Sequence, residues 1–313
     1  CVLTAVGVFG DVAIITVAPI GIQIAKKLKY RKLGILIAMI GGVKAGNVIS
    51  PNPNAIAAAD SFHQPLTSIM MVGLPCSLVA IIVTTFIAKL LSNKGTTIEN
   101  MHIDMENKDL PTFIGAITGP AVTVLLLILR PTLGIVIDPL IALPIGGICG
   151  ILAMKKGKNT LEFLTMGLQK MSGVSLLLVG TGALSGIIAN STLKDVIVEG
   201  IRILGLPPYL LAPVAGTLMG AATASSTAGT TLGSQIFGPT ILEYGLAPLA
   251  VAGMIHAGRF VFDGLPHGSF FHISAGSINM EISERLKLIV WESLIGIGMV
   301  TTSTILFGVL NII

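Results

Sequence analysis

The sequence has little charge and few cysteines, and each shortage excludes a class of protein. Asp, Glu, Lys and Arg make up 11% of the 313 residues, far below the roughly 25% of ordinary soluble domains. The net charge of +4 does not suggest a nucleic-acid partner. Cys1, Cys76 and Cys149 lie far apart in apolar runs, which favours buried thiols over a disulfide framework or a metal site.

Apolar residues are abundant instead, at 53% of the chain with a mean hydropathy of +0.91. Long apolar stretches separated by short charged ones predict an all-α polytopic membrane protein, because a soluble chain of this composition would aggregate. About ten stretches are long enough to cross a bilayer wholly or in part. They fall near 2–25, 33–50, 67–91, 112–129, 133–154, 172–190, 207–224, 228–243, 246–262 and 288–310.

The charged loops predict how the chain is oriented. Basic residues concentrate at 26–32 and 155–158, and the mixed loop 92–111 lies between them. Two predicted spans separate each loop from the next, so all three loops share one side. The positive-inside rule assigns that side to the cytoplasm. Arg285 and Lys287 form a last basic turn before the final span, which would leave the C-terminus outside.

Loop 92–111 also divides the predicted domains. We expect a first repeat core at 1–91, a cytoplasmic linker at 92–111, connecting spans at 112–171 and a second repeat core at 172–313. Within the second core, residues 193–205 read as a short interfacial helix, because apolar and charged residues alternate there at helical spacing.

A weak internal repeat supports two cores. Lys44-Ala45-Gly46 is matched 212 residues later by His256-Ala257-Gly258, and each triplet precedes a Pro-containing break. The same offset pairs Gly10-Asp11-Val12 with Ala222-Thr223-Ala224, which lies next to Ser225-Ser226-Thr227. The loop KKLKYRK of the first half is basic, whereas GPTILEY of the second half carries no positive charge. Opposite loop charge at matched positions indicates an inverted-topology repeat with broken or re-entrant helices.

The first polar break, GNVISPNPNAIAAAD at 46–60, holds Pro51 and Pro53, which disfavour helix in the residues before them. Unwound backbone at membrane depth survives only inside protein or along a water-filled cavity. We interpret the break as a ligand site, and a kink whose polar groups satisfy only their neighbours is the alternative. Asn47 and three further side chains there can hydrogen-bond hydroxyl groups. The predicted substrate-binding residues of this break are Ser50, Asn52 and Asn54.

The second break, 220–235, is rich in hydroxyl groups, and Gly229 and Gly233 weaken its helix. It is interpreted as the tip of a re-entrant segment, with small-residue helix packing as the alternative. The predicted substrate-binding residues here are Ser225, Ser226, Thr227 and Thr230.

The third break, RFVFDGLPHGSFFH at 259–272, places ionisable groups at membrane depth, where they are expensive and usually functional. Arg259 is predicted to hold a substrate carboxylate or to pair with Asp263. Asp263 and His267, with Asp11 of the first half, are the predicted proton carriers. Two further ionisable residues lie in apolar runs: Lys44 can snorkel or pair with an acid, and Asp138 marks a helix end.

These stretches resemble the gluconate permease family of bacterial proton-coupled organic-acid symporters over nearly the whole chain. The resemblance is carried by VFGDVAIITVAPIG (8–21), GNVISPNPNAIAAA (46–59), GAATASSTAGTT (220–231), FDGLPHGSFFH (262–272) and ERLKLIVWESLIG (284–296). It implies two inverted repeats, a homodimer with a moving transport domain, and further spans before Cys1. Gluconate transporters differ at Ser50-Pro51-Asn52-Pro53 and Leu265-Pro266-His267, so related hydroxy acids are candidate substrates as well.

The resulting hypothesis is a secondary active transporter of the bacterial inner membrane that imports a small hydroxycarboxylate by proton symport. No cofactor or metal is expected, and motifs of hydrolases, metalloproteases and nucleotide-binding enzymes are absent from the sequence. The alternatives are sodium coupling, an uncoupled channel or facilitator, and a membrane-embedded enzyme.

Overall fold

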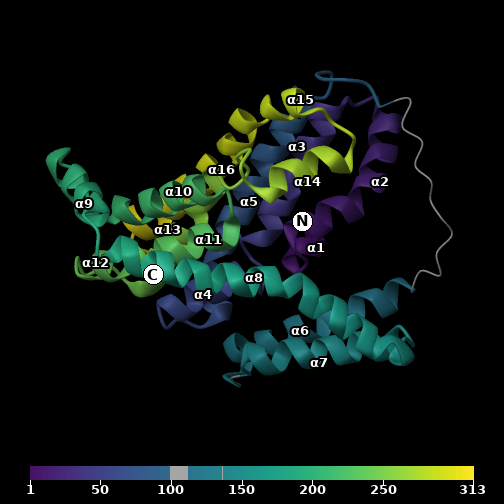
Figure 1. Cartoon of the computed structure of the whole chain (residues 1–313), viewed down its shortest axis with the longest axis horizontal. Coiled ribbons are helices and arrows are strands. Elements are labelled where there is room, and N and C mark those ends of the chain that lie inside the picture. Colours follow the sequence, from purple (N-terminus) through teal and green to yellow (C-terminus); the bar gives the residue numbers. More distant parts are fainter. Residues whose placement is uncertain (99–111, 136) are drawn as a thin grey trace. The chain divides into compact units, whose positions relative to one another are not determined.

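A computed structural model describes residues 1–98, 112–135 and 137–313, and every regular element in these ranges is helical (Figure 1). The chain forms two compact units, one of Cys1–His102 with Thr181–Ile313 and the other of Ile103–Gly180. The all-α part of the predicted fold is therefore confirmed. Residues 99–111 of the predicted linker lie outside the described ranges.

The first half of the larger unit contains five helices. They are α1 (Val2–Ala5), α2 (Gly10–Leu28), α3 (Lys32–Asn47), α4 (Pro53–Ser61) and α5 (Leu66–Leu90). Helix α2 ends where Lys29 adopts a left-handed conformation with φ of 56°. Helix α3 is apolar all round and most of its side chains are buried, as expected of a helix in the centre of a bundle.

The second half of the larger unit begins with the end of α8 (Thr160–Ala189) and α9 (Leu193–Ile203). The segment predicted as a short interfacial helix at 193–205 is therefore helical over residues 193–203. The remaining elements are η2 (Pro208–Leu210), α10 (Leu211–Thr223), α11 (Ser226–Leu232), η3 (Gly233–Phe237), α12 (Gly238–Leu242), α13 (Pro248–Gly258), η4 (Arg259–Val261), α14 (Ser269–Ser277), α15 (Ile282–Leu286), α16 (Ile289–Ser303) and η5 (Thr304–Val309).

The core of the larger unit is a four-helix arrangement of α3, α5, α13 and α16 (Figure 1). Helix α5 packs against the other three, and short helices cover the bundle: α1 packs on α3, and α10 packs on α13. Buried Ile, Leu, Val and Ala side chains fill the space between them. This apolar interior makes each buried polar group in it expensive unless it is paired.

The smaller unit is built around the hairpin of α6 (Phe113–Leu133) and α7 (Pro139–Ala153), which is followed by η1 (Gly157–Asn159). Asp138 caps α7, because its carboxylate accepts a hydrogen bond of 2.7 Å from the backbone N–H of Leu140. The predicted helix end at Asp138 is thus confirmed. Gly119 faces Gly146 and Gly150 across the hairpin, and these small residues allow the two backbones to approach closely.

By length and composition, two described helices can cross a membrane, Leu66–Leu90 and Ile282–Val309. Two shorter apolar helices are Ile114–Leu127 and Pro139–Ala153. The other membrane segments among the roughly ten that the sequence predicts remain a prediction. The prediction of buried cysteines is correct for Cys76, whereas Cys149 is half-buried and Cys1 is exposed; all three are free thiols.

We predict that Gly220→Ala destabilises the protein, because a Cβ atom at Gly220 in α10 would lie 2.5 Å from the carbonyl oxygen of Arg259. Overpacking against backbone typically costs about 1–3 kcal/mol, so the thermal unfolding midpoint in detergent should fall. Gly276→Ala in α14 is the matched control, since a Cβ atom there meets nothing within 4 Å. An equal midpoint for both variants would contradict the close approach of α10 and η4.

Candidate functional site

Three breaks between helices gather in the larger unit. They are residues 48–52 between α3 and α4, residues 224–225 between α10 and α11, and residues 262–268 between η4 and α14. Helix α4 packs against α11, and η4 packs against α10, α11 and α16. The polar backbone and side chains of the three breaks therefore lie in one region, although they are far apart in the sequence.

Two of the predicted ligand residues cap the helices that follow the breaks. Asn52 is extended, with φ of −105°, and its side-chain oxygen accepts hydrogen bonds from the backbone N–H groups of Asn54 and Ala55 at 3.1 and 3.0 Å. Ser225 accepts a bond of 3.3 Å from the N–H of Ala228. Capping satisfies N–H groups that a helix start leaves free, so both side chains stabilise the first turn of the helix that follows them.

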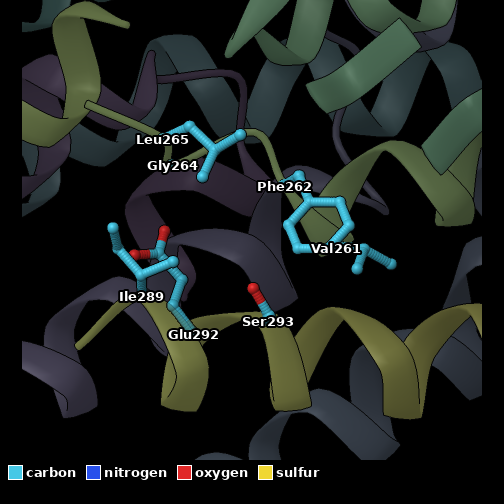
Figure 2. Close-up of a pocket in the computed structure, with 7 residues that line it drawn as sticks. All are labelled: Val261, Phe262, Gly264, Leu265, Ile289, Glu292 and Ser293. Carbon is cyan, nitrogen blue, oxygen red and sulfur yellow. The ribbon is translucent and has the colours of Figure 1, made fainter. Parts of the chain in front are cut away.

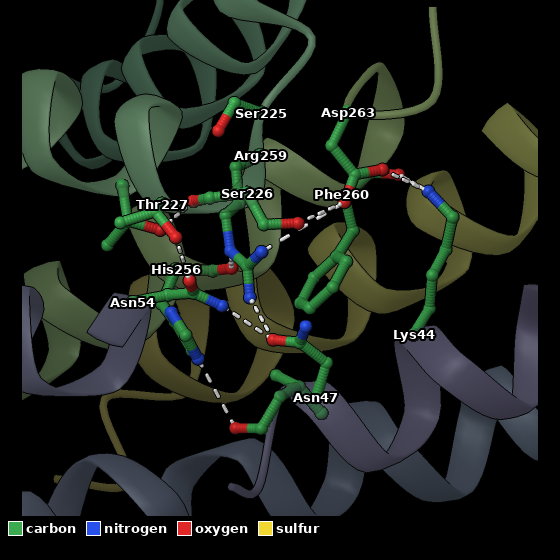
Figure 3. A network of polar contacts seen from close by, with 12 residues as sticks. Lys44, Asn47, Asn54, Ser225, Ser226, Thr227, His256, Arg259, Phe260 and Asp263 are labelled. Carbon is green, nitrogen blue, oxygen red and sulfur yellow. Dashed lines mark hydrogen bonds and ion pairs between the residues drawn. The ribbon is translucent and has the colours of Figure 1, made fainter. Parts of the chain in front are cut away.

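Asn47, the last residue of α3, is the centre of a hydrogen-bond network that joins the two halves of the larger unit (Figure 3). Its Oδ1 atom accepts bonds from Asn52 Nδ2 at 2.8 Å, Asn54 Nδ2 at 2.6 Å and Arg259 Nη2 at 3.1 Å. Asn54 Oδ1 in turn accepts a bond of 2.7 Å from the Thr227 hydroxyl. The first two breaks are thereby connected through side chains.

Arg259 is fully buried and faces the same network. Its Nε donates to the carbonyl oxygen of His256 at 3.2 Å, and its guanidinium lies 3.7 Å from the centroid of the Phe260 ring. Nη1 lies 4.0 Å from Asp263 Oδ2 and has no hydrogen-bond partner. A buried guanidinium N–H without a partner is costly, so this atom is a free donor of the site, as is Nη1 of Arg285.

Arg259 begins a series of five buried, alternating charges that we call the ion-pair chain: Arg259, Asp263, Lys44, Glu292 and Arg285. Lys44 Nζ pairs with Asp263 Oδ1 and lies 3.4 Å from Glu292 Oε1. Arg285 Nη2 lies 2.7 Å from Glu292 Oε2. With every group ionised, the chain holds three cations and two carboxylates.

Glu292 borders a narrow pocket that is too tight to hold a water molecule (Figure 2). The pocket is lined by Val261, Phe262, Gly264, Leu265, Ile289, Glu292 and Ser293. Phe262, Leu265 and Ile289 are half-buried, whereas Glu292 is buried at the inner wall. Its carboxylate approaches Gly264 so closely that a Cβ atom there would overlap Oε1.

The structure places the other predicted residues in different surroundings. Ser226 donates a bond of 2.7 Å to Asp263 Oδ2, and the buried Thr230 hydroxyl donates to the Ser226 carbonyl at 3.0 Å. Ser50 is fully buried and its hydroxyl has no partner. Two predicted proton carriers lie apart from the ion-pair chain: His267 is exposed, and Asp11 accepts a bond of 3.4 Å from Ser269.

Sequence reasoning did not identify Glu292 and Arg285 as site residues. Their signal was present, since a Glu within the apolar stretch IVWESLIG is unusual at membrane depth. Asn47 was considered for hydroxyl binding, but nothing in the sequence indicated that three donors converge on it. Lys44 was given two possible roles, and the structure selects pairing with an acid.

Two comparisons place the chain among known proteins. The model of the "Na+-H+ antiporter family" matches residues 115–204. A protein of Haemophilus influenzae, described as an uncharacterized transporter, is 54% identical over 309 residues, which cover 98% of this chain and 74% of the relative.

We predict that Asn47→Ala destabilises the larger unit, because it removes the acceptor shared by Asn52, Asn54 and Arg259. A buried donor left unpaired costs about 1–3 kcal/mol, so the thermal unfolding midpoint should fall clearly. Asn190→Ala is the control, since Asn190 is exposed and bonds only to a carbonyl of its own helix among the contacts described. If the two variants unfold at the same temperature, Asn47 does not hold the breaks together.

Proposed function

This chain belongs to the family of membrane transporters that includes the Haemophilus influenzae relative, and we propose that it imports a small hydroxycarboxylate together with a proton. It is a transporter and not an enzyme. Gluconate or a related hydroxy acid is the proposed substrate, because the polar stretches resemble those of the gluconate permeases. The proposed location is the bacterial inner membrane, and a homodimer follows from the same resemblance.

The unequal charges of the ion-pair chain are the observation that carries this proposal. Two carboxylates face three cations, and Arg259 Nη1 has no hydrogen-bond partner. An uncompensated charge in an apolar interior is strongly unfavourable. A carboxylate ligand would supply the missing negative charge and would accept hydrogen bonds from the guanidinium.

The surroundings of Arg259 favour a ligand that also carries hydroxyl groups. Asn54, Thr227 and Ser226 lie within the network around it (Figure 3). Amide and hydroxyl side chains can both donate and accept, so they suit the hydroxyl groups of a sugar acid. Ser50 adds a buried hydroxyl without a partner. Asn52 and Ser225 would shape the site as helix caps.

Asp263 provides the physical basis for coupling to protons. Its Oδ1 pairs with Lys44, and its Oδ2 accepts from Ser226 and lies 4.0 Å from Arg259. Protonation would remove one negative charge beside two cations, which strengthens their attraction for an anionic substrate. By linkage, a bound anion raises the affinity of Asp263 for a proton by the same factor. A proton and a carboxylate would therefore bind and move together.

Contacts across the site support the proposed inverted repeat. Lys44 Nζ donates to the carbonyl oxygen of Phe260 at 2.7 Å, and His256 Nε2 lies 3.3 Å from that of Val48. Lys44 and His256 are one repeat offset apart, and so are Val48 and Phe260. Exchanging the two halves therefore turns each of these contacts into the other, as in a two-fold symmetric interface.

Helix packing follows the same correspondence. Asn47 and Arg259, also one offset apart, hydrogen-bond to each other. Helix α4 of the first half packs on α11 of the second, and α14 of the second packs on α2 of the first. The pair α1 and α3 likewise corresponds to α10 and α13. We therefore propose a substrate site at the interface between two inverted repeats.

Sodium coupling is the second candidate, and the matched antiporter family model favours it. The matched residues, 115–204, include no member of the ion-pair chain. Unwound carbonyl groups with Ser and Asn side chains suit Na⁺ as well as they suit a proton carrier. Transport measurements at a controlled sodium concentration therefore distinguish Na⁺ from H⁺ as the coupling cation.

The test is uptake of labelled gluconate by the full-length protein in proteoliposomes under an inward proton gradient at fixed sodium. Accumulation that a protonophore abolishes is the expected result, and unlabelled hydroxy acids should compete according to their fit to the site. Uptake that stops at equilibrium would identify a facilitator instead. Accumulation that follows a sodium gradient alone would overturn proton coupling.

We predict that Asp263→Asn loses accumulation against a gradient, by about tenfold or more, while exchange of internal for external substrate is partly retained. The amide can still accept from Ser226 but cannot take up a proton. Asp60→Asn makes the same change at an exposed position and should transport normally. Equal loss of accumulation and exchange in Asp263→Asn would indicate a structural role.

A further inference from the structure

Glu292 is a buried member of the ion-pair chain that pairs with Lys44 and Arg285. It lies on α16 and its two oxygens face different groups: Oε2 accepts a hydrogen bond of 2.7 Å from Arg285, whereas Oε1 has no hydrogen-bond partner. Lys44 Nζ is 3.4 Å from Oε1 but is not in hydrogen-bonding geometry. One oxygen of the carboxylate is therefore held in place, and the other is free to accept a proton.

Glu292 lines the pocket shown in Figure 2. Gly264 lies directly against Oε1, because any larger residue at this position would overlap that atom. The rim residue Ile289 is two positions after Lys287, which is exposed in the polar turn that follows α15. The pocket thus lies between an exposed turn and a buried carboxylate.

We propose that Glu292 takes up and releases the transported proton beside this pocket, and that Lys44 relays the proton between Glu292 and Asp263. This inference rests on the proposed proton coupling and adds a route for it. Glu292, Lys44 and Asp263 form consecutive members of the ion-pair chain. The route joins the pocket to the substrate site, since Asp263 Oδ2 contacts Ser226.

The relay is balanced in protons and charge. In one direction, the Lys44 ammonium gives its proton to Asp263 Oδ1, with which it is in contact, and becomes a neutral amine. A protonated Glu292 then gives its proton to Lys44 and becomes a carboxylate. The net result is one proton moved from Glu292 to Asp263, and the reverse order releases a proton to the pocket.

The groups that face Glu292 come from several elements. Lys44 of α3 and Arg285 of α15 are within ion-pair distance. From η4, Arg259 reaches Asp263 rather than Glu292. The titratable groups of α13 and α5 contact other partners or solvent: His256 lies by Val48, Cys76 by Ser303, and Lys89 is exposed. The sequence TILFGV of η5 contains no titratable residue.

Contacts around the pocket indicate the side on which it opens. Lys32 Nζ donates to the carbonyl oxygen of Asn279 at 2.6 Å, and Thr96 donates to Glu284 through its N–H at 2.7 Å and its hydroxyl at 2.8 Å. The turn 278–288 therefore lies beside the basic loop 26–32 and the start of loop 92–111. The positive-inside rule assigns these loops to the cytoplasm, so we place proton release on that side.

Infrared difference spectroscopy tests the proton-accepting role without any substrate. Spectra of the full-length protein in acidic and alkaline buffer should contain a carboxyl C=O band from a buried acid, and Glu292→Gln should remove it. Glu281→Gln is the control, because Glu281 is exposed on the same turn. A band unchanged in Glu292→Gln would overturn the proposal, whatever the transported substrate is.

Transport measurements test the relay. Glu292→Gln should lower proton-driven accumulation by about 100-fold, a typical contribution of a positioned proton-transfer group, while substrate exchange continues. Glu292→Asp keeps a carboxylate and should restore part of the accumulation. Full accumulation in Glu292→Gln would overturn the relay. If that variant does not fold, Glu292→Asp must shift the infrared band and slow accumulation, and an unchanged band and rate would overturn it.

The two tests separate this inference from the proposed function. If wild-type protein accumulates no hydroxycarboxylate, the proposed substrate is wrong, and the infrared result still decides whether Glu292 takes up a proton. If wild-type protein accumulates substrate with protons but both Glu292 variants behave as wild type, only the relay fails.

Discussion

Lys44 is buried in the last turn of α3, inside a bundle whose other helices are mainly apolar. An isolated ammonium there would carry a desolvation penalty of several kcal/mol. Its pairing with Asp263, which lies 219 residues later in the chain, offsets part of that penalty. Once this pair forms, α3 and the break after η4 must lie together. The positions of Glu292, Arg259 and Arg285 then follow, because each of them pairs with a member already placed.

A second constraint acts on the breaks in the helices: buried backbone N–H and C=O groups require hydrogen-bond partners. Pro51 and Pro53 end the helical path of α3, and the Asn52 side chain satisfies the N–H groups that open α4. Ser225 does the same for α11. The polar residues of a break therefore divide into two kinds. Some hold the unwound chain, whereas others, such as Arg259 and Ser50, keep an atom without a partner.

In the function we propose, the charged groups that pair within the structure also take part in transport. The Lys44–Asp263 contact connects the two halves of the larger unit, and protonation of Asp263 would weaken it while strengthening the attraction for an anion. An interface whose main ion pair depends on a proton can adopt two arrangements of similar energy, which is what alternating access requires. In this proposal, the carboxylate that binds the proton is also the residue that the substrate site and the interface share.

The sequence by itself determined the helical class, the positions at which the helices break, and the segments in which the ionisable residues are concentrated. These features are local: apolar run length, proline and capping residues act within a few positions of the chain. Only the tertiary structure decided which charges pair, that Asn47 receives three donors, and that Asn52 and Ser225 cap helices. It also separated His267 and Asp11 from the ion-pair chain. The physical reason is that a buried charge or amide takes its partner from whichever segment packs beside it, and that neighbour can be more than 200 residues away in sequence, as Lys44 and Asp263 are.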